Sequence, residues 1–78
     1  KRAECHFSNG TQRIRYLQRH FFGRQELLYF DSDRGKFVAV AELGESQAKI
    51  WNQDKDVLRR MMGNVDRFCR HNYGIYEP

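Results

Sequence analysis

The sequence predicts an α+β fold, in which a four-stranded antiparallel sheet is followed by one long, bent helix across one face. Two observations lead to this prediction. Apolar and polar residues alternate with a period of two through the first half of the chain, whereas residues 51–72 repeat with a period near 3.6. The length of 78 residues allows one domain with a modest core.

The alternation, and the turn residues that interrupt it, define the predicted strands. Asn9-Gly10 is a strong hairpin signal, and residues 31–35 combine Asp, Ser and Gly in a second turn. The predicted strands cover residues 3–8, 12–22, 26–31 and 36–42.

The second predicted strand has an unusual face, which is apolar at its ends and polar in its middle. Gln18 and His20 occupy the middle, between Tyr16 and Phe22. A sealed core would not tolerate these polar side chains without partners, because burying an unpaired polar group costs free energy. We therefore expect this face to form the floor of a binding cleft.

The helix is expected to begin after Ser46, a suitable N-cap residue, and to end at residues 72–74, with Gly63 marking a bend. One stripe should pack on the sheet: Trp51, Leu58, Met62, Val65 and Cys69. A second stripe mixes apolar and polar residues, as a ligand-facing wall would: Ile50, Asp54, Val57, Met61, Asn64, Phe68 and Asn72. The other positions, among them Arg60, Gly63 and Arg67, form an outward face. Periodicity alone also fits an ordinary amphipathic helix.

The two cysteines, Cys5 and Cys69, favour one structural disulfide, although two free cysteines in a cytosolic protein are the alternative. Such a bond closes a loop of about 64 residues and stabilises the fold by about 4 kcal/mol in the chain-entropy model. Asn9-Gly10-Thr11 fits the acceptor pattern for glycosylation at Asn9. Together the two features indicate an extracytoplasmic domain.

Composition argues against several other functions. The net charge is +4, but the basic residues are scattered among acidic ones, so no nucleic-acid partner is expected. No enzymatic activity is expected, because His6, His20 and His71 have no acid or nucleophile at a telling spacing. No metal or cofactor motif, membrane-spanning run or signal peptide is recognised.

Four stretches, ECHFSNGTQRIRYL, FDSDRGKFVAVAELG, WNQDKDVL and VDRFCRHNYG, resemble the membrane-distal β1 domain of MHC class II β chains over essentially the whole chain. The resemblance implies half of an open-ended groove, completed by a class II α chain. That groove binds an extended antigenic peptide for a T-cell receptor of CD4 T cells, at the cell surface and in endosomal or lysosomal membranes. Residues 1–78 would then be a fragment with a truncated first strand, lacking the Ig-like domain and membrane anchor.

The resemblance also implies residue roles. Trp51, His71 and Asn72 would hydrogen-bond the peptide main chain. The remaining roles are in pockets for peptide side chains. A central pocket would be lined by Ala3, Tyr16, Arg60, Met61, Asn64 and Phe68, with His20 and Lys1 near the neighbouring pocket, and a pocket further along by Gln18, Phe37, Trp51 and Val57. Leu27, Gln47 and Ile50 would lie at the end that holds the peptide's C-terminal portion, and Ile75 and Tyr76 at the other end.

Two hypotheses concern peptide preference. Many family members have Asp where this chain has Gln47, so an α-chain Arg would be free to bind an acidic anchor. Lys1, His20 and Arg60 would favour acidic residues in the middle of the groove.

Two alternative functions remain at the level of sequence. One is a non-presenting, class II-like peptide-exchange accessory chain. The other is an autonomous secreted basic module that binds glycans through Arg13, Arg15, Arg19 and Arg24.

Overall fold

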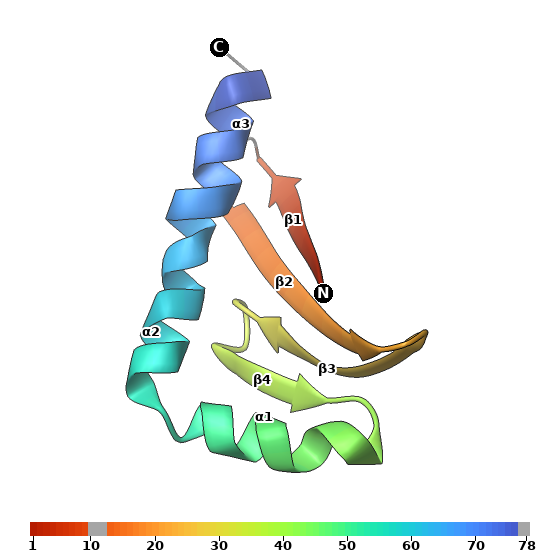
Figure 1. Cartoon of the computed structure of the whole chain (residues 1–78). Coiled ribbons are helices and arrows are strands. Elements are labelled where there is room, and N and C mark those ends of the chain that lie inside the picture. The colour runs from red at the N-terminus through yellow and green to blue at the C-terminus, as the bar shows by residue number, and fades with distance from the viewer. Residues whose placement is uncertain (10–12, 77–78) are drawn as a thin grey trace.

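A computed structural model describes residues 1–9 and 13–76 and confirms the α+β fold (Figure 1). The four strands pair in the order β1-β2-β3-β4, and every neighbouring pair is antiparallel. Their bounds are Arg2–Ser8 for β1, Arg13–Phe22 for β2, Gln25–Asp31 for β3 and Lys36–Ala39 for β4. None of the helices in the described part of the chain is long and apolar enough to cross a membrane.

The helical half is interrupted rather than continuous. After η1 (Glu42–Gly44) come α1 (Glu45–Asn52), α2 (Lys55–Asn64), the π-helical segment η2 (Val65–Arg70) and α3 (His71–Tyr76). Residues 53 and 54 join α1 to a rod formed by α2, η2 and α3, and the two parts run in different directions (Figure 1).

The sequence predicted Ser46 as the N-cap of the helix, but Ser46 is the N-cap of neither helical part. Helix α1 already begins at Glu45, and its N-cap position is Gly44, where a Cβ atom would overlap the carbonyl oxygen of Leu27. Glycine is needed there because the helix approaches the backbone of β3 so closely. The side-chain cap is instead Asp54, whose Oδ1 accepts hydrogen bonds from the backbone N–H groups of Asp56 (3.0 Å) and Val57 (3.2 Å).

This capped break, rather than Gly63, is where the chain turns, and the helix continues past residues 72–74 to Tyr76. The methionine that faces the sheet also differs from the prediction. Met62 was assigned to the sheet-facing stripe, but its exposed fraction is 42%, whereas that of Met61 is 7%. Val57, Leu58 and Val65 pack against the core, so the side of α2 that meets the sheet lies between the two predicted stripes and leaves Met62 at its margin.

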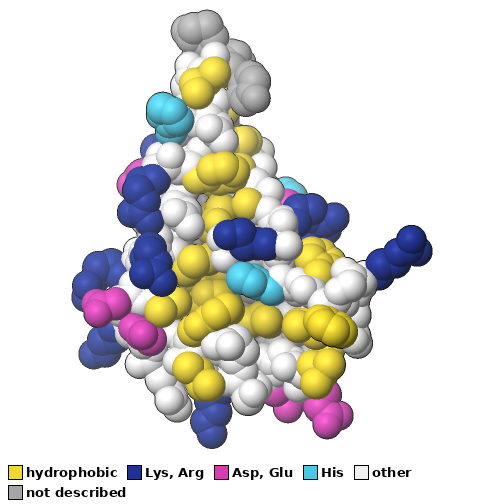
Figure 2. All heavy atoms as spheres, viewed as in Figure 1, with side chains coloured by type: hydrophobic (Ala, Val, Ile, Leu, Met, Phe, Trp, Pro, Cys, Tyr) yellow, Lys and Arg dark blue, Asp and Glu magenta, His cyan; other side chains and the backbone are white. Residues whose placement is uncertain are grey.

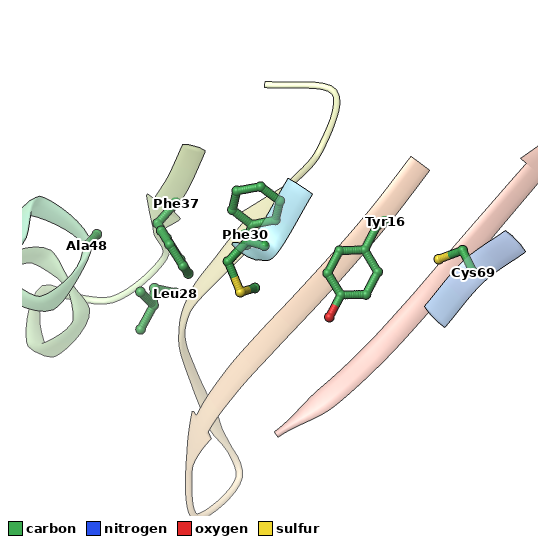
Figure 3. Close-up of a cluster of buried hydrophobic side chains, with 7 residues drawn as sticks. Tyr16, Leu28, Phe30, Phe37, Ala48 and Cys69 are labelled. Carbon is green, nitrogen blue, oxygen red and sulfur yellow. The ribbon is translucent and has the colours of Figure 1, made fainter. Parts of the chain in front are cut away.

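The core lies between the sheet and the helices, and it combines residues from β2, β3, β4, α1, α2 and η2 (Figure 3). The rings of Phe30 and Phe37 from adjacent strands lie 5.2 Å apart, and Tyr16 lies 6.4 Å from Phe30. Burial of these apolar surfaces is the main term that stabilises the fold. The buried cluster comprises Tyr16, Leu28, Phe30, Phe37, Ala48, Met61 and Cys69.

The predicted disulfide is confirmed, and it joins edge strand β1 to η2. Cys5 and Cys69 are bonded, with their Cα atoms 5.6 Å apart. The ring of Phe7, two positions further along the same strand face, lies 5.0 Å from that of Tyr73 in α3. The bond and this aromatic contact hold β1 against the helical rod.

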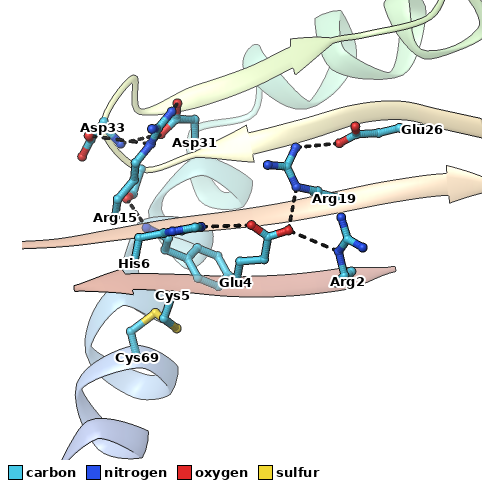
Figure 4. Close-up of polar contacts among 12 residues, drawn as sticks. Arg2, Glu4, Cys5, His6, Arg15, Arg19, Glu26, Asp31, Asp33 and Cys69 are labelled. Atoms are coloured by element: carbon cyan, nitrogen blue, oxygen red, sulfur yellow. Dashed lines mark hydrogen bonds and ion pairs between the residues drawn. A yellow bond between two sulfur atoms is a disulfide. The ribbon is translucent and has the colours of Figure 1, made fainter.

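Ion pairs cover the opposite face of the sheet (Figure 4). The carboxylate of Glu4 accepts hydrogen bonds from Arg19 (2.8 Å) and Arg2 (3.2 Å), and Arg19 also binds Glu26 (2.9 Å). The hydrogen bond from Arg19, followed by that from His6, lowers the pKa of Glu4 to about 2.

A second cluster on this face surrounds the fully buried carboxylate of Asp31. Arg15 donates to both of its oxygens, at 3.1 and 2.7 Å. The hydrogen bond from Arg15 lowers the pKa of Asp31, and the backbone N–H of Asp33 adds to this effect. A bidentate pair of this kind satisfies a carboxylate that has no access to water.

The side chain of Asn52, at the end of α1, binds the free edge of β4. Its Oδ1 accepts from the backbone N–H of Phe37 (2.7 Å), and its Nδ2 donates to the carbonyl of the same residue (2.9 Å). An edge strand leaves one row of peptide groups without a strand partner, and Asn52 supplies partners for two of them.

We expect Glu4→Gln to destabilise the protein at pH 7, with the difference from wild type disappearing near pH 2. Folding lowers the pKa of Glu4 from its ordinary value of 4.5 to about 2. Its ionised form therefore stabilises the fold above pH 4.5, and this contribution is lost as the pH falls from 4.5 towards 2. Urea unfolding across this range measures the effect. Asp66→Asn, in an exposed pair, is the control, and a difference independent of pH would contradict the assignment.

We expect Asn52→Ala to lower the free energy of unfolding by about 2 kcal/mol, because two peptide groups of β4 lose their partners. Denaturant unfolding measures the loss. Gln53→Ala, at the neighbouring exposed position, is the control and should change stability little. Equal effects of the two substitutions would contradict the role given to Asn52.

Candidate functional site

A hollow of about 390 Å³ lies between the sheet and the helices. Apolar side chains gather on this side of the molecule, with basic side chains among and around them (Figure 2). The hollow is lined by Lys1, by Gln18 and His20 from β2, by Phe37 from β4, by Trp51 from α1, by Val57, Arg60, Met61 and Asn64 from α2, and by Arg67 from η2.

A second hollow, of about 270 Å³, adjoins the first. Lys1, Gln18 and Asn64 line both, so the two form one depression along the sheet. The other residues of the second hollow are Ala3, Tyr16 and Phe68.

Hydrogen bonds connect the polar side chains on the floor of this depression. The hydroxyl of Tyr16 accepts from Gln18 Nε2 (3.0 Å) and from Asn64 Nδ2 (3.3 Å). Gln18 Oε1 accepts from His20 Nε2 (2.9 Å). Gln18 and His20, which the sequence predicted to lie on the floor of a binding cleft, both line the hollow, and their side chains satisfy each other there.

Aromatic contacts hold the side of the hollow next to α1. The Trp51 ring lies 5.0 Å from Phe37 and 5.3 Å from His20. Burial of the His20 ring, followed by the positive charge of Lys1, lowers the pKa of His20. The imidazole is therefore neutral at pH 7 and adds no charge to the floor.

The structure brings most of the predicted central residues together but leaves the predicted ends of the site apart from the two hollows. Leu27, Gln47, Ile50, His71, Asn72 and Ile75 line neither hollow. Ile50 and Ile75 are exposed by 59% and 61%. Tyr76 belongs to α3, but its side chain lies outside the described part of the structure.

The predicted glycosylation site is only partly described. Asn9 is exposed at the end of β1, with a φ of 55°, which agrees with a turn. Gly10 and Thr11 lie outside the described residues.

Arg67 was missed as a site residue, because helical periodicity placed it on the outward face. Its Nη2 donates to the carbonyl of Arg60 (2.6 Å) and to Asn64 Oδ1 (3.1 Å), so the side chain folds back along the helix to the hollow. Gly63, four positions earlier, was the available signal, since it leaves this part of the helix surface uncovered.

The arginines proposed for glycan binding are mostly engaged with carboxylates of this chain. Arg13 pairs with Asp33 (2.6 Å), Arg15 with Asp31 (2.7 Å) and Arg19 with Glu4 (2.8 Å). They do not form a free cationic surface. Within residues 1–9 and 13–76, no three His, Cys, Asp or Glu side chains are grouped so that they could hold a metal ion.

Comparison with known proteins identifies relatives over nearly the whole chain. A family described as "Class II histocompatibility antigen, beta domain" matches residues 1–77. The human "HLA class II histocompatibility antigen, DR beta 3 chain" is 53% identical over 77 residues, which are 99% of this chain and 29% of the relative. The pig "SLA class II histocompatibility antigen, DQ haplotype C beta chain" is 51% identical over 97% of this chain and 29% of the relative.

A more distant relative comes from a bird. The chicken "Class II histocompatibility antigen, B-L beta chain" is 49% identical over 97% of this chain and 33% of the relative. The chain thus spans about a third or less of the length of these relatives.

We expect Tyr16→Phe to lower the free energy of unfolding by about 1–2 kcal/mol, because Gln18 and Asn64 lose their shared acceptor while the ring is kept. Thermal or urea unfolding measures the change. Tyr29→Phe, on the opposite face of the sheet, is the matched control. A Tyr16→Phe protein as stable as wild type would show that the floor hydrogen bonds contribute nothing net.

Proposed function

Because the chain belongs to the class II histocompatibility antigen β-domain family, which is not a family of enzymes, we propose that it forms half of a peptide-binding groove. A class II α chain would supply the other half. The groove would present extended antigenic peptides to T-cell receptors of CD4 T cells.

The depression between the sheet and the helices is the observation that carries this proposal. Its floor is polar and internally hydrogen-bonded, and its apolar walls come from Trp51, Phe37, Val57 and Met61. Such a mixture suits a ligand with both peptide groups and side chains. The helices border it on their own side only, and β1 lies at the edge of the sheet. A partner chain adding a second helix and more strands would complete a groove.

The proposed main-chain contacts are Trp51, His71 and Asn72. Trp51 lines the central hollow, while His71 is exposed and Asn72 half-buried in α3, near the far end of the helical rod. An indole N–H, an imidazole and an amide can each pair with peptide groups without reading side chains. Because these residues are spread along the helices, they could hold an extended peptide at several points.

The proposed side-chain pockets follow the same axis. Tyr16, Ala3, Phe68 and Asn64 would surround one anchor, and the hollow beside Trp51 the next. The exposed Ile50, with Leu27 and Gln47, would bind the C-terminal portion of the peptide, and Ile75 and Tyr76 the first anchor.

Cellular location is proposed on the same basis. The Cys5–Cys69 disulfide fits an oxidising compartment. We place the domain outside the cytosol, at the cell surface and in endosomal or lysosomal membranes, as part of a membrane-anchored chain like its relatives, with a glycan at Asn9.

The two alternatives receive less support. The glycan-binding module would need Arg13, Arg15 and Arg19, which are paired with carboxylates. A peptide-exchange chain would have the same fold. It differs from the proposed function in that its heterodimer would not keep peptides bound.

We expect co-expression with a class II α chain in a secretory host to yield a heterodimer from which acid releases extended peptides of mixed sequence with evenly spaced anchors. Mass spectrometry of the eluted material tests this. A heterodimer without peptide would contradict presentation and favour the exchange chain. A stably folded monomer would favour the autonomous module.

Trp51→Phe sharpens the test, because it keeps an aromatic ring against Phe37 and His20 but removes the indole N–H. Faster peptide dissociation from an otherwise intact heterodimer is the expected result. Phe22→Leu, at an exposed position outside both hollows, is the control.

A further inference from the structure

The guanidinium group of Arg67 lies over the surface of α2 at Gly63. Its Nη2 donates to the Arg60 carbonyl and to Asn64 Oδ1, and a Cβ atom on residue 63 would overlap its Nη1. Glycine within a helix costs about 1 kcal/mol relative to alanine. At this position it gives the arginine room to fold back to the hollow.

The guanidinium of Arg67 adds to the positive charge of the central hollow, which no carboxylate in the lining balances. Lys1, Arg60 and Arg67 line the central hollow, whereas none of its lining residues is Asp or Glu. In the part of the chain that the structure describes, none of these three forms an ion pair, although many other arginines do. A cationic site with apolar walls favours an anion carried on a short apolar stem.

Asn64 connects this arginine to the floor. Its Oδ1 accepts from Arg67, and its Nδ2 donates to the Tyr16 hydroxyl, which also accepts from Gln18. The position of the guanidinium and the orientation of the amide therefore depend on each other. A guanidinium has five N–H donors in a rigid fork, so the two bonds from Nη2 leave donors for a ligand.

We propose that Arg67, positioned by Gly63, is a specificity-determining residue, and that the central hollow binds the side-chain carboxylate of an Asp or Glu in the presented peptide. This inference rests on the proposed function. It adds a binding residue, Arg67, that the sequence had placed on the outward face of the helix. It also explains the position of that residue, because the helix surface at Gly63 has no side chain and leaves room for the guanidinium.

The test uses the assembled heterodimer with a class II α chain and two peptides that differ only by Glu or Gln at the central anchor. The pair has nearly the same shape, so the ratio of the two affinities reports charge recognition. A charge-assisted hydrogen bond predicts that wild type binds the Glu peptide about tenfold more tightly. Competition binding measures the ratio.

Two substitutions separate the charge of Arg67 from its position. Arg67→Gln removes the charge, and Gly63→Ala keeps the charge but displaces the guanidinium while favouring the helix. Both should reduce the Glu/Gln ratio several-fold. Arg59→Gln, which removes an equal charge from an exposed position paired with Asp56, is the matched control and should keep the wild-type ratio.

The outcomes distinguish this inference from the proposed function. Binding of both peptides with a ratio that neither Gly63→Ala nor Arg67→Gln changes would overturn the role of Arg67 and leave presentation standing. A heterodimer that binds neither peptide, nor any eluted peptide, would overturn both. If Arg67→Gln does not assemble, Arg67→Met, which also removes the charge but keeps an unbranched apolar stem, replaces it. An unchanged ratio for the methionine variant and for Gly63→Ala would equally overturn the inference.

Discussion

The covalent bond between Cys5 and Cys69 joins two parts of the chain whose relative position creates the site. One cysteine lies in edge strand β1 and the other in η2, at a sequence separation of 64. A domain of this size buries a modest core, so a bond that closes so long a loop contributes a large share of its stability. Without it, core packing and the contact between Phe7 and Tyr73 would be left to hold β1 against the helical rod.

Within that frame, the floor reconciles two requirements that usually conflict. A sheet face under a helix is buried and apolar, whereas a surface that binds peptide groups needs hydrogen-bonding side chains. Here Tyr16 belongs to the core through its ring and to the hollow through its hydroxyl, which joins Gln18 and Asn64. The polar groups satisfy one another in the empty depression, so the floor is preorganised and not a set of unpaired buried groups.

The two faces of the sheet divide the charges between them. Carboxylates such as Glu4 and Asp31 neutralise most arginines of β1 and β2 on the outer face. The lysine and arginines that line the hollow have no such partners in the described structure. A mildly basic chain thus concentrates its effective positive charge at the proposed peptide-binding surface, which composition alone does not reveal.

The sequence by itself determined the strands, the disulfide and the polar floor of β2, because each depends on a local pattern or on a unique pair of residues. Period-two alternation places Gln18 and His20 on one face wherever the strand lies, and two cysteines have one possible intramolecular partner each. The resemblance of whole motifs added the family.

Only the tertiary structure decided which side of the helix meets the sheet and which long side chains reach the hollow. Met61, and not Met62, lies in the core because the side of α2 that meets the sheet runs between the two predicted stripes, through Val57, Leu58, Met61 and Val65. Arg67 does not point outward, because its long side chain folds back over Gly63 and donates to the Arg60 carbonyl and to Asn64 Oδ1. Helical periodicity predicts the direction of a Cβ atom. The guanidinium is several bonds further from the backbone, and its position depends on its hydrogen-bond partners. Those partners are brought together only by the tertiary structure.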